Sequence, residues 1–347
     1  MSINVILLAK NYEKYSSGYY HQDIVDSFRK LTNCYVYGPG YYNYDKNDSI
    51  EDVISKSPFN KNDIDLIVCN TNWDEDGKDD TVDPHPNIDL SRINNIFKVY
   101  FLNKEYKKLE LRFEYIKKQK FNLVCTVLPK AKEWEKELDV KFLHLPFGIS
   151  LDRFKDFQLP KKYDFSFTGN LHKTHTDIRF MVKKQIFNEK YLHLKSNIGL
   201  SVLFKSNPIK KKFQKYNIYW AEWGARSIWF KSLLPKGINY AKFMNQSKVF
   251  LNTPSALGIF NTRFFELMAT KSLIFCPSGF DYLDILKDGY NCVMFKVDMS
   301  DFEEKLVYYI ENDIARQEIV ENAYNDVKNH SYDKRIEKLL SFIERKG

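Results

Sequence analysis

Short apolar segments that alternate with longer helical patterns are the feature that most constrains how this sequence can fold. In the first half, "INVILLA" (3–9) is followed by a helix candidate at 21–31, and the alternation then continues. Such apolar runs are typical of strands buried on both faces, which occur in parallel sheets covered by crossover helices. The further elements expected there are strands at 34–38, 65–71, 97–103, 122–128 and 141–148, and a charged helix near 104–119.

The same alternation starts again after a polar, proline-containing segment at 149–163. The elements expected in this half are strands at 164–169, 217–224, 248–253, 272–277 and 291–295, helices near 174–187, 239–246 and 258–270, and three helical segments over 300–345. We therefore expect an α/β protein of two Rossmann-like domains with a cleft between them. The predicted boundaries are 1–155 for the first domain, 156–330 for the second, and 331–347 for a final helix.

Composition limits the classes of protein that the chain can belong to. The 347 residues are 44% hydrophobic, which excludes a mostly disordered chain, and the net charge of +8 suits an anionic ligand or surface. The five cysteines are scattered and odd in number, as expected for small core residues in a reducing compartment. The start lacks the pattern of a signal peptide, and no apolar run is long enough to span a bilayer. We expect a cytoplasmic protein, with at most a peripheral contact at the inner face of the membrane.

The segment "KVFLNTPSALGIFNTRFFELMAT" (248–270) is a candidate anion site. A strand and a turn precede a helix that should begin near Asn261 or Thr262, both good N-cap residues. The N–H groups of a first helical turn favour a phosphate. Arg263 could neutralise a diphosphate or orient Glu266, and Glu266 could accept two hydrogen bonds from a ribose diol. An ion pair between Arg263 and Glu266 that only stabilises the helix is the alternative interpretation.

Three stretches, "NYAKFMNQSKVFLNT", "GIFNTRFFELMAT" and "DYLDILKDGYNCVMF", resemble the C-terminal half of group 1 glycosyltransferases. The likeness is greatest to the subgroup named after the spore maturation protein, and it covers about residues 140–345. It implies the GT-B fold, in which two Rossmann-like domains flank a cleft, and a metal-independent reaction without a cofactor. It also implies that the second domain holds a nucleotide-sugar donor, that the first is the acceptor domain, and that the final helix packs back on the first domain.

The resemblance also implies which side chains contact the donor. Glu266 matches the glutamate that binds ribose, and Thr262 and Arg263 match the helix start beside the phosphates. The residues expected at the donor are Gly169, Asn170, Lys173, Ser255, Asn261, Thr262, Arg263 and Glu266. Many retaining members carry a second glutamate eight residues before Glu266, where this chain has Gly258. This departure leaves the stereochemistry open.

Basic groups must offset the charge of the leaving nucleoside diphosphate if no metal does so. Arg226 and Lys231 are favoured for this role because "WGARSIWFK" follows a predicted strand end. Arg179 and Lys236 are further candidates, and each of these cations could instead be a solvated surface charge. His21, after the first strand, could act as a base near neutral pH, although a packing histidine is more common.

The acidic segment "NWDEDGKDDTVD" (72–83) allows several interpretations. Asp74 and Asp76 form a D-x-D, which holds a divalent metal in GT-A glycosyltransferases, and the spacing also matches a calcium loop in part. Because the segment follows a predicted strand, Asp74 could instead act as the acceptor base. A solvated acidic loop is the leading interpretation.

The leading functional hypothesis is a glycosyltransferase that moves a sugar from a nucleoside-diphosphate donor to a hydroxyl of a glycan or lipid-linked acceptor. The alternatives are a metal-dependent GT-A-type transferase that uses Asp74 and Asp76, and a non-catalytic protein that binds glycans or nucleic acid. Nucleic acid is not expected as a partner in the leading hypothesis.

Overall fold

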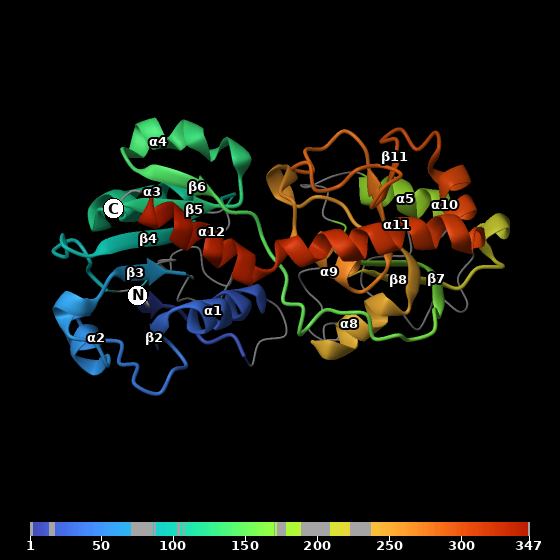
Figure 1. Ribbon diagram of the computed structural model, residues 1–347. Coiled ribbons are helices and arrows are strands. Elements are labelled where there is room, and N and C mark those ends of the chain that lie inside the picture. The colour runs from blue at the N-terminus through green and yellow to red at the C-terminus, as the bar shows by residue number, and fades with distance from the viewer. Residues whose placement is uncertain are drawn as a thin grey trace. The chain divides into compact units, whose positions relative to one another are not determined.

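The chain separates into two compact units, each built on a parallel sheet (Figure 1). The first unit is Met1–Gly148 with Ser331–Gly347, and the second is Ile149–His330. The computed structural model describes residues 3–13, 18–70, 86, 88–102, 105–106, 108–169, 171, 178–188, 209–222 and 237–345. The predicted α/β class, with two Rossmann-like sheets, is confirmed.

The first sheet has six strands in the order β2-β1-β3-β4-β5-β6, and all neighbouring strands are parallel. The strands are β1 (Asn4–Leu8), β2 (Asn33–Tyr37), β3 (Leu66–Cys69), β4 (Phe97–Leu102), β5 (Leu123–Thr126) and β6 (Lys141–His144). The helices are α1 (Tyr20–Leu31), α2 (Ile50–Lys56), α3 (Leu109–Gln119), α4 (Glu133–Leu138) and α12 (Tyr332–Glu344).

Both faces of the first sheet are buried, which explains why its strands are apolar throughout. Ile6 and Leu8 of β1 pack in one core cluster with residues of α2, α3 and α4. Val5 and Leu7, which point to the opposite face, pack in a second cluster with residues of α1 and α12. The last helix of the chain is therefore part of the first unit's core.

The second sheet has five strands in the order β11-β10-β9-β7-β8, again all parallel. The strands are β7 (Tyr163–Gly169), β8 (Ile218–Glu222), β9 (Ser247–Leu251), β10 (Leu273–Pro277) and β11 (Val293–Phe295). The helices are α5 (Ile178–Ile186), α8 (Ile238–Asn245), α9 (Thr262–Ala269), α10 (Phe302–Glu311) and α11 (Asp313–Asp326). Residues of α5 and α10 share a core cluster with Phe165 and Phe167, whereas Phe243 of α8 packs on Phe250, with ring centroids 5.9 Å apart.

The helix boundaries differ from the prediction at specific residues. The charged helix expected near residue 104 begins at Leu109, because Lys108 has a left-handed backbone with φ of 53° that no helix can include. The helix expected at 258–270 begins at Thr262, after a 3-10 turn at Ala256–Gly258. The short helices α2 and α4 were not predicted.

Candidate functional site

The strand order of the second sheet places a switch point between β7 and β9. The chain passes from β7 to β8 on one side and then returns to β9 on the other side of β7. In open parallel sheets, ligands bind beyond the carboxyl ends of the two strands at such a point. Here those ends carry Thr168 and Gly169 of β7, and Asn252 and Thr253 after β9.

Arg263 ties the start of α9 to the end of β7. Its Nη1 donates a hydrogen bond of 2.8 Å to the carbonyl oxygen of Thr168, whose hydroxyl lies 2.8 Å from the hydroxyl of Tyr240 in α8. Burial raises the pKa of Tyr240, the Arg263 charge opposes that shift, and the Glu266 charge adds to it. Tyr240, Arg263 and Glu266 are therefore electrostatically coupled beside the end of β7.

Glu266 is far less accessible than the sequence analysis assumed. It lies one helical turn after Arg263, as the spacing predicts, but only 2% of its surface is exposed. A ribose diol could reach this carboxylate only if a covering group moved aside. The buried position near Arg263 and Tyr240 also suits the alternative of a structural acid, so the ribose role stays a prediction.

Arg179 is a cation that the sequence analysis did not favour, yet it lies at the switch point. It is in the first turn of α5, and its Nε donates a hydrogen bond of 2.8 Å to the hydroxyl of Thr253. Burial, and to a lesser degree the charge of Arg263, lower the pKa of Arg179 to about 10. Two guanidinium groups that repel each other at one strand edge form an arrangement that an anion would stabilise.

Gly169 provides the space that the Arg179 guanidinium occupies. A Cβ atom at this position would lie 2.9 Å from Cζ of Phe167 and 3.4 Å from Nη1 of Arg179. The guanidinium carbon of Arg179 lies 5.8 Å from the centroid of the Phe167 ring, so the three residues pack as one group. Any larger residue at 169 would displace the ring or the guanidinium.

Asn261 is the N-cap residue of α9, but its side chain does not cap the helix. Its Nδ2 instead donates to the carbonyl oxygen of Thr253 at 2.9 Å, and its Oδ1 accepts from Nδ2 of Asn252 at 3.1 Å. Asn261 therefore ties the helix start to the end of β9. Thr262 is half-buried as the first residue of α9, and Ser255 is held by a backbone bond of 2.9 Å from its N–H to the oxygen of Ile259.

Several predicted site residues lie outside the part of the chain that the structure describes. They are Asp74, Asp76, Asn170, Lys173, Arg226, Lys231 and Lys236. Their proposed roles remain sequence-based. Of the predicted donor residues, the structure brings Gly169, Asn261 and Arg263 to the switch point.

His21 lies beside the corresponding switch point of the first sheet, between β1 and β3. Its backbone oxygen accepts a hydrogen bond of 3.3 Å from Nδ2 of Asn70, the residue after β3. Its ring lies 4.7 Å from the ring of Tyr12 and 4.0 Å from that of Tyr20, and the residue is 3% exposed. The location suits a base, whereas the burial between aromatic rings suits a packing residue.

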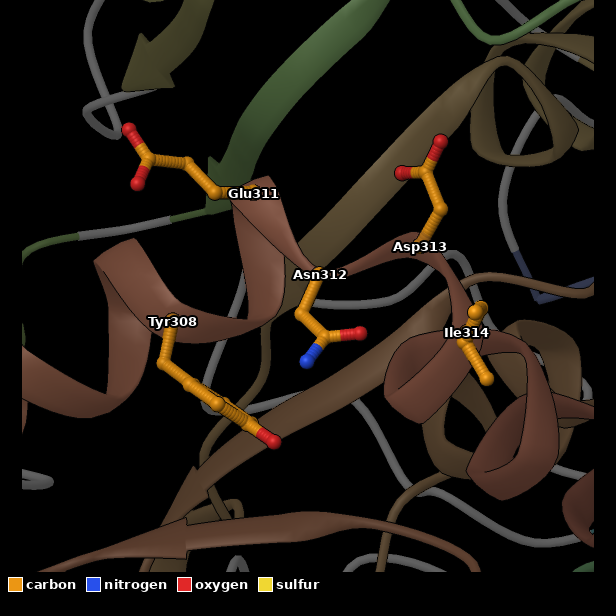
Figure 2. Close-up of a pocket in the computed structure, with 5 residues that line it drawn as sticks. All are labelled: Tyr308, Glu311, Asn312, Asp313 and Ile314. Carbon is orange, nitrogen blue, oxygen red and sulfur yellow. The ribbon is translucent and has the colours of Figure 1, made fainter.

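A separate surface hollow of about 470 Å³ lies where α10 meets α11. Figure 2 shows Glu311 and Asp313 directed away from Tyr308 and Asn312. Glu311 accepts a hydrogen bond of 2.6 Å from the hydroxyl of Tyr216, which precedes β8, so this hollow is at the amino ends of the strands. It is therefore at the wrong edge of the sheet for the predicted donor.

Comparisons with known proteins agree with this architecture. Residues 203–341 match a family model described as glycosyl transferase-like. The solved structure of Anabaena HepE in complex with UDP-glucose has a TM-score of 0.59 at 11% identity, over 99% of this chain and 100% of that one. A Rickettsia africae glycosyltransferase gives a TM-score of 0.56 at 11% identity, over 99% of this chain and 98% of that one. The chain therefore has the two-domain GT-B fold, and residues 203–341 resemble the glycosyl transferase-like family.

Sucrose-phosphate synthase from Thermosynechococcus elongatus also has a similar structure, with a TM-score of 0.57 at 8% identity over 99% of this chain and 100% of its own. No curated protein matches the sequence. These likenesses support the GT-B prediction over the GT-A-type alternative. Within the described part of the chain, no helix combines the length and the apolar character needed to cross a bilayer.

Proposed function

We propose that this protein is a glycosyltransferase, which moves a sugar from a nucleoside-diphosphate donor, bound at the β7–β9 switch point, to a hydroxyl of a glycan or lipid-linked acceptor. The observation that carries the proposal is the pair of guanidinium groups, Arg179 and Arg263, at the carboxyl ends of these two strands. They supply the positive charge that a departing diphosphate requires. The second unit would then be the donor domain and the first unit the acceptor domain.

In this proposal, the end of β7 and the start of α9 hold the diphosphate. Arg263 is anchored to the Thr168 carbonyl and Arg179 to the Thr253 hydroxyl, so both cations are oriented before the donor arrives. Such preorganised charge lowers the energy of the transition state without reorganisation during the reaction. Glu266 would bind the ribose after an opening movement, and Lys173, Arg226 and Lys231 would add positive charge.

The finer points of the proposal follow from the sequence resemblance. We place the protein in the spore-maturation-protein-like subgroup, with a reaction that needs neither metal nor cofactor. It would act in the cytoplasm, where its net charge of +8 suits a peripheral contact with an anionic membrane face. A base in the first unit, His21 or Asp74 in the sequence-based hypothesis, would deprotonate the acceptor.

Titration calorimetry with UDP, GDP and ADP tests the donor site. We expect one of these nucleotides to bind, and Arg179→Gln and Arg263→Gln each to weaken it about tenfold or more, since each removes a charged partner of the phosphates. Lys215→Gln is the matched control, because it removes one charge at the opposite edge of the same sheet, where Lys215 pairs with Glu311 at 2.6 Å. Equal affinity in all four proteins would contradict the proposed site.

The ribose role of Glu266 has its own test in the same assay. Glu266→Gln should weaken nucleotide binding, because the amide is a poorer acceptor for the diol than the carboxylate. For the deoxyribose analogues of the nucleotides, wild type and Glu266→Gln should have equal affinity. If no nucleotide or nucleotide sugar bound while glycans did, the alternative of a non-catalytic glycan-binding protein would be supported.

A further inference from the structure

A basic surface of the second unit lies where the end of α5 meets the turn before β8. Two contacts join these segments. The N–H of Lys210 donates a hydrogen bond of 3.0 Å to the carbonyl oxygen of Ile186, and Phe187 forms an antiparallel bridge with Ile209. These contacts bring together six residues that we call the lysine patch: Lys183 and Lys184 of α5, with Lys210, Lys211, Lys212 and Lys215 in and beside the 3-10 turn at Lys211–Phe213.

The sequence "KKKFQKY" (210–216) directs its lysines outward because its aromatic residues are the anchors. Phe213 is fully buried in the core of the second unit, and Tyr216 is 9% exposed. The N–H of Tyr216 donates to the carbonyl oxygen of Phe213 at 3.1 Å, and the N–H of Phe213 donates to that of Lys210 at 2.8 Å, which fixes the turn. The side chains beside the anchors stay exposed, and they are Lys211, Lys212 and Lys215.

Acidic side chains neutralise only part of the lysine patch. Glu303 pairs with Lys212, and Glu311 pairs with Lys215 at 2.6 Å. Burial, and to a lesser degree the charge of Lys210, lower the pKa of Lys212, as expected where like charges crowd together. Three members of the patch form no ion pair with any residue that the structure describes, and they are Lys184, Lys210 and Lys211. The patch therefore keeps a positive charge that an external anion can offset.

The chemistry of the lysine patch suits lipid headgroups better than nucleic acid. None of its six cations is an arginine, the side chain that binds a phosphate through two parallel hydrogen bonds. The two aromatic rings of its turn, Phe213 and Tyr216, are buried, so neither offers a face on which a base could stack. An anionic membrane face requires neither feature, because clustered lysines bind it through charge alone.

The lysine patch lies at the edge of the second sheet opposite to the proposed donor site. Helix α5 carries Arg179 in its first turn, bonded to Thr253 at the switch point, and Lys184 in its last turn. The turn at Lys211–Phe213 comes before β8, at the amino end of that strand. A membrane held against this edge leaves the carboxyl ends of β7 and β9 open, so a membrane and a nucleotide can bind at the same time.

We propose that the lysine patch docks the second unit on an anionic membrane surface, through the phosphates of acidic lipids such as phosphatidylglycerol. This inference rests on the proposed function for the membrane contact, which there follows from net charge alone, and assigns that contact to one surface. Docking is electrostatic and reversible, because each lysine near an anionic surface raises the partition onto the membrane only about fivefold. Salt weakens it by screening the charges.

The test is vesicle sedimentation at low salt with the full chain. The probes are vesicles of phosphatidylglycerol mixed with phosphatidylcholine, and vesicles of phosphatidylcholine alone. The patch variant carries Lys184→Gln, Lys210→Gln and Lys211→Gln. The control variant carries Lys242→Gln, Lys287→Gln and Lys296→Gln, which change three exposed lysines elsewhere in the same unit. Both variants lose three positive charges, so they differ only in where the charge is removed.

We expect wild type to bind the mixed vesicles and not those of phosphatidylcholine alone. The patch variant should bind the mixed vesicles about 100-fold more weakly, since three lysines at the contact are lost, whereas the control variant should bind like wild type. The UDP affinity, measured by calorimetry, should be the same in all three proteins.

Equal vesicle affinity of the patch and control variants would overturn the inference, as would failure of wild type to bind the mixed vesicles. Binding of single-stranded DNA that depended on the same three lysines, without vesicle binding, would overturn it in favour of the nucleic-acid alternative. The donor site has a separate readout in these experiments. Vesicle binding through the patch by a wild type that bound no nucleotide or nucleotide sugar would contradict the proposed function and leave the docking surface standing.

Discussion

At the scale of single residues, Gly169 at the end of β7 leaves the space in which the Arg179 guanidinium lies. Gly169 has no Cβ atom, and Arg179 and Phe167 use the space that this leaves. The hydrogen bond from Arg179 to Thr253 then joins α5 to the segment after β9. Gly169 therefore positions a cation in addition to any direct contact with a ligand.

Gly169→Ala tests this dependence. The new methyl group would lie 2.9 Å from the Phe167 ring and 3.4 Å from the guanidinium, so we expect Arg179 to move and nucleotide affinity to fall about tenfold. Gly289→Ala is the control, since its strained φ of +73° should cost stability but it has no atom within 4 Å of the added carbon. Calorimetry and thermal melts separate the two effects, and unchanged nucleotide binding in Gly169→Ala would show that Arg179 is not needed.

Burial raises the pKa of Glu105, a buried acid that follows β4 in the first unit, and this shift predicts a pH dependence of stability. The folded chain holds this proton at pH values where the unfolded chain, with an ordinary pKa near 4.5, has lost it. The stabilisation is therefore complete below that value and is lost as the pH rises through the folded-state pKa. Relative to Glu105→Gln, the wild type should lose unfolding free energy as the pH rises from 4.5 into that range, as measured by urea titrations at several pH values. A constant difference would contradict the raised pKa.

At the scale of elements, hydrophobic patterns predicted the strands well but gave less exact helix starts. Because both faces of each sheet are covered, its strands are apolar along their whole length. These apolar runs predicted every strand that the structure describes in the two sheets. Helix starts depend on individual backbone angles and tertiary contacts. Lys108 adopts a left-handed backbone, and Asn261 bonds to the end of β9 instead of capping α9. The capping box of Ser49 and Asp52 marks the start of α2 in the sequence, but the prediction relied on hydrophobic patterns and did not use it.

The element that closes the first unit is α12, although it lies at the end of the sequence. Ile336 is fully buried in the cluster that α12 shares with α1 and the first sheet. Ile336→Ala should therefore lower the free energy of unfolding by about 3 kcal/mol, the usual cost of such a cavity. Lys334→Ala, on the same helix and pointing to solvent with a 56% exposed side chain, should change it little. Urea denaturation measures both, and equal stabilities would show that the first unit does not depend on this helix.

At the scale of the whole molecule, the sequence predicted the fold class and one part of the candidate site. The alternation of strands and helices defined two α/β halves, and the residues around Arg263 were proposed as a donor site because they follow a strand end. Arg179 was named only as one of several candidate cations and was not favoured, because its position depends on which strands lie side by side. Sheet order is set by long-range packing that no local pattern records.

A reaction without a metal is part of the proposed function. We expect nucleotide binding and donor turnover to be unchanged in excess EDTA, because arginine side chains supply the charge that a divalent ion would otherwise provide. Loss of activity in EDTA, with recovery on addition of magnesium, would instead favour a metal site in the acidic segment 72–83. In the part of the chain that the structure describes, no group of three or more His, Cys, Asp or Glu residues is arranged to hold a metal.

A crystal structure of the chain with a bound nucleoside diphosphate tests the central claim most directly. We predict that the diphosphate lies beyond the ends of β7 and β9, with its oxygens within hydrogen-bond distance of the Arg179 and Arg263 guanidinium groups. A nucleotide bound elsewhere, with Arg263 still bonded to Thr168 and Arg179 to Thr253, would contradict the account.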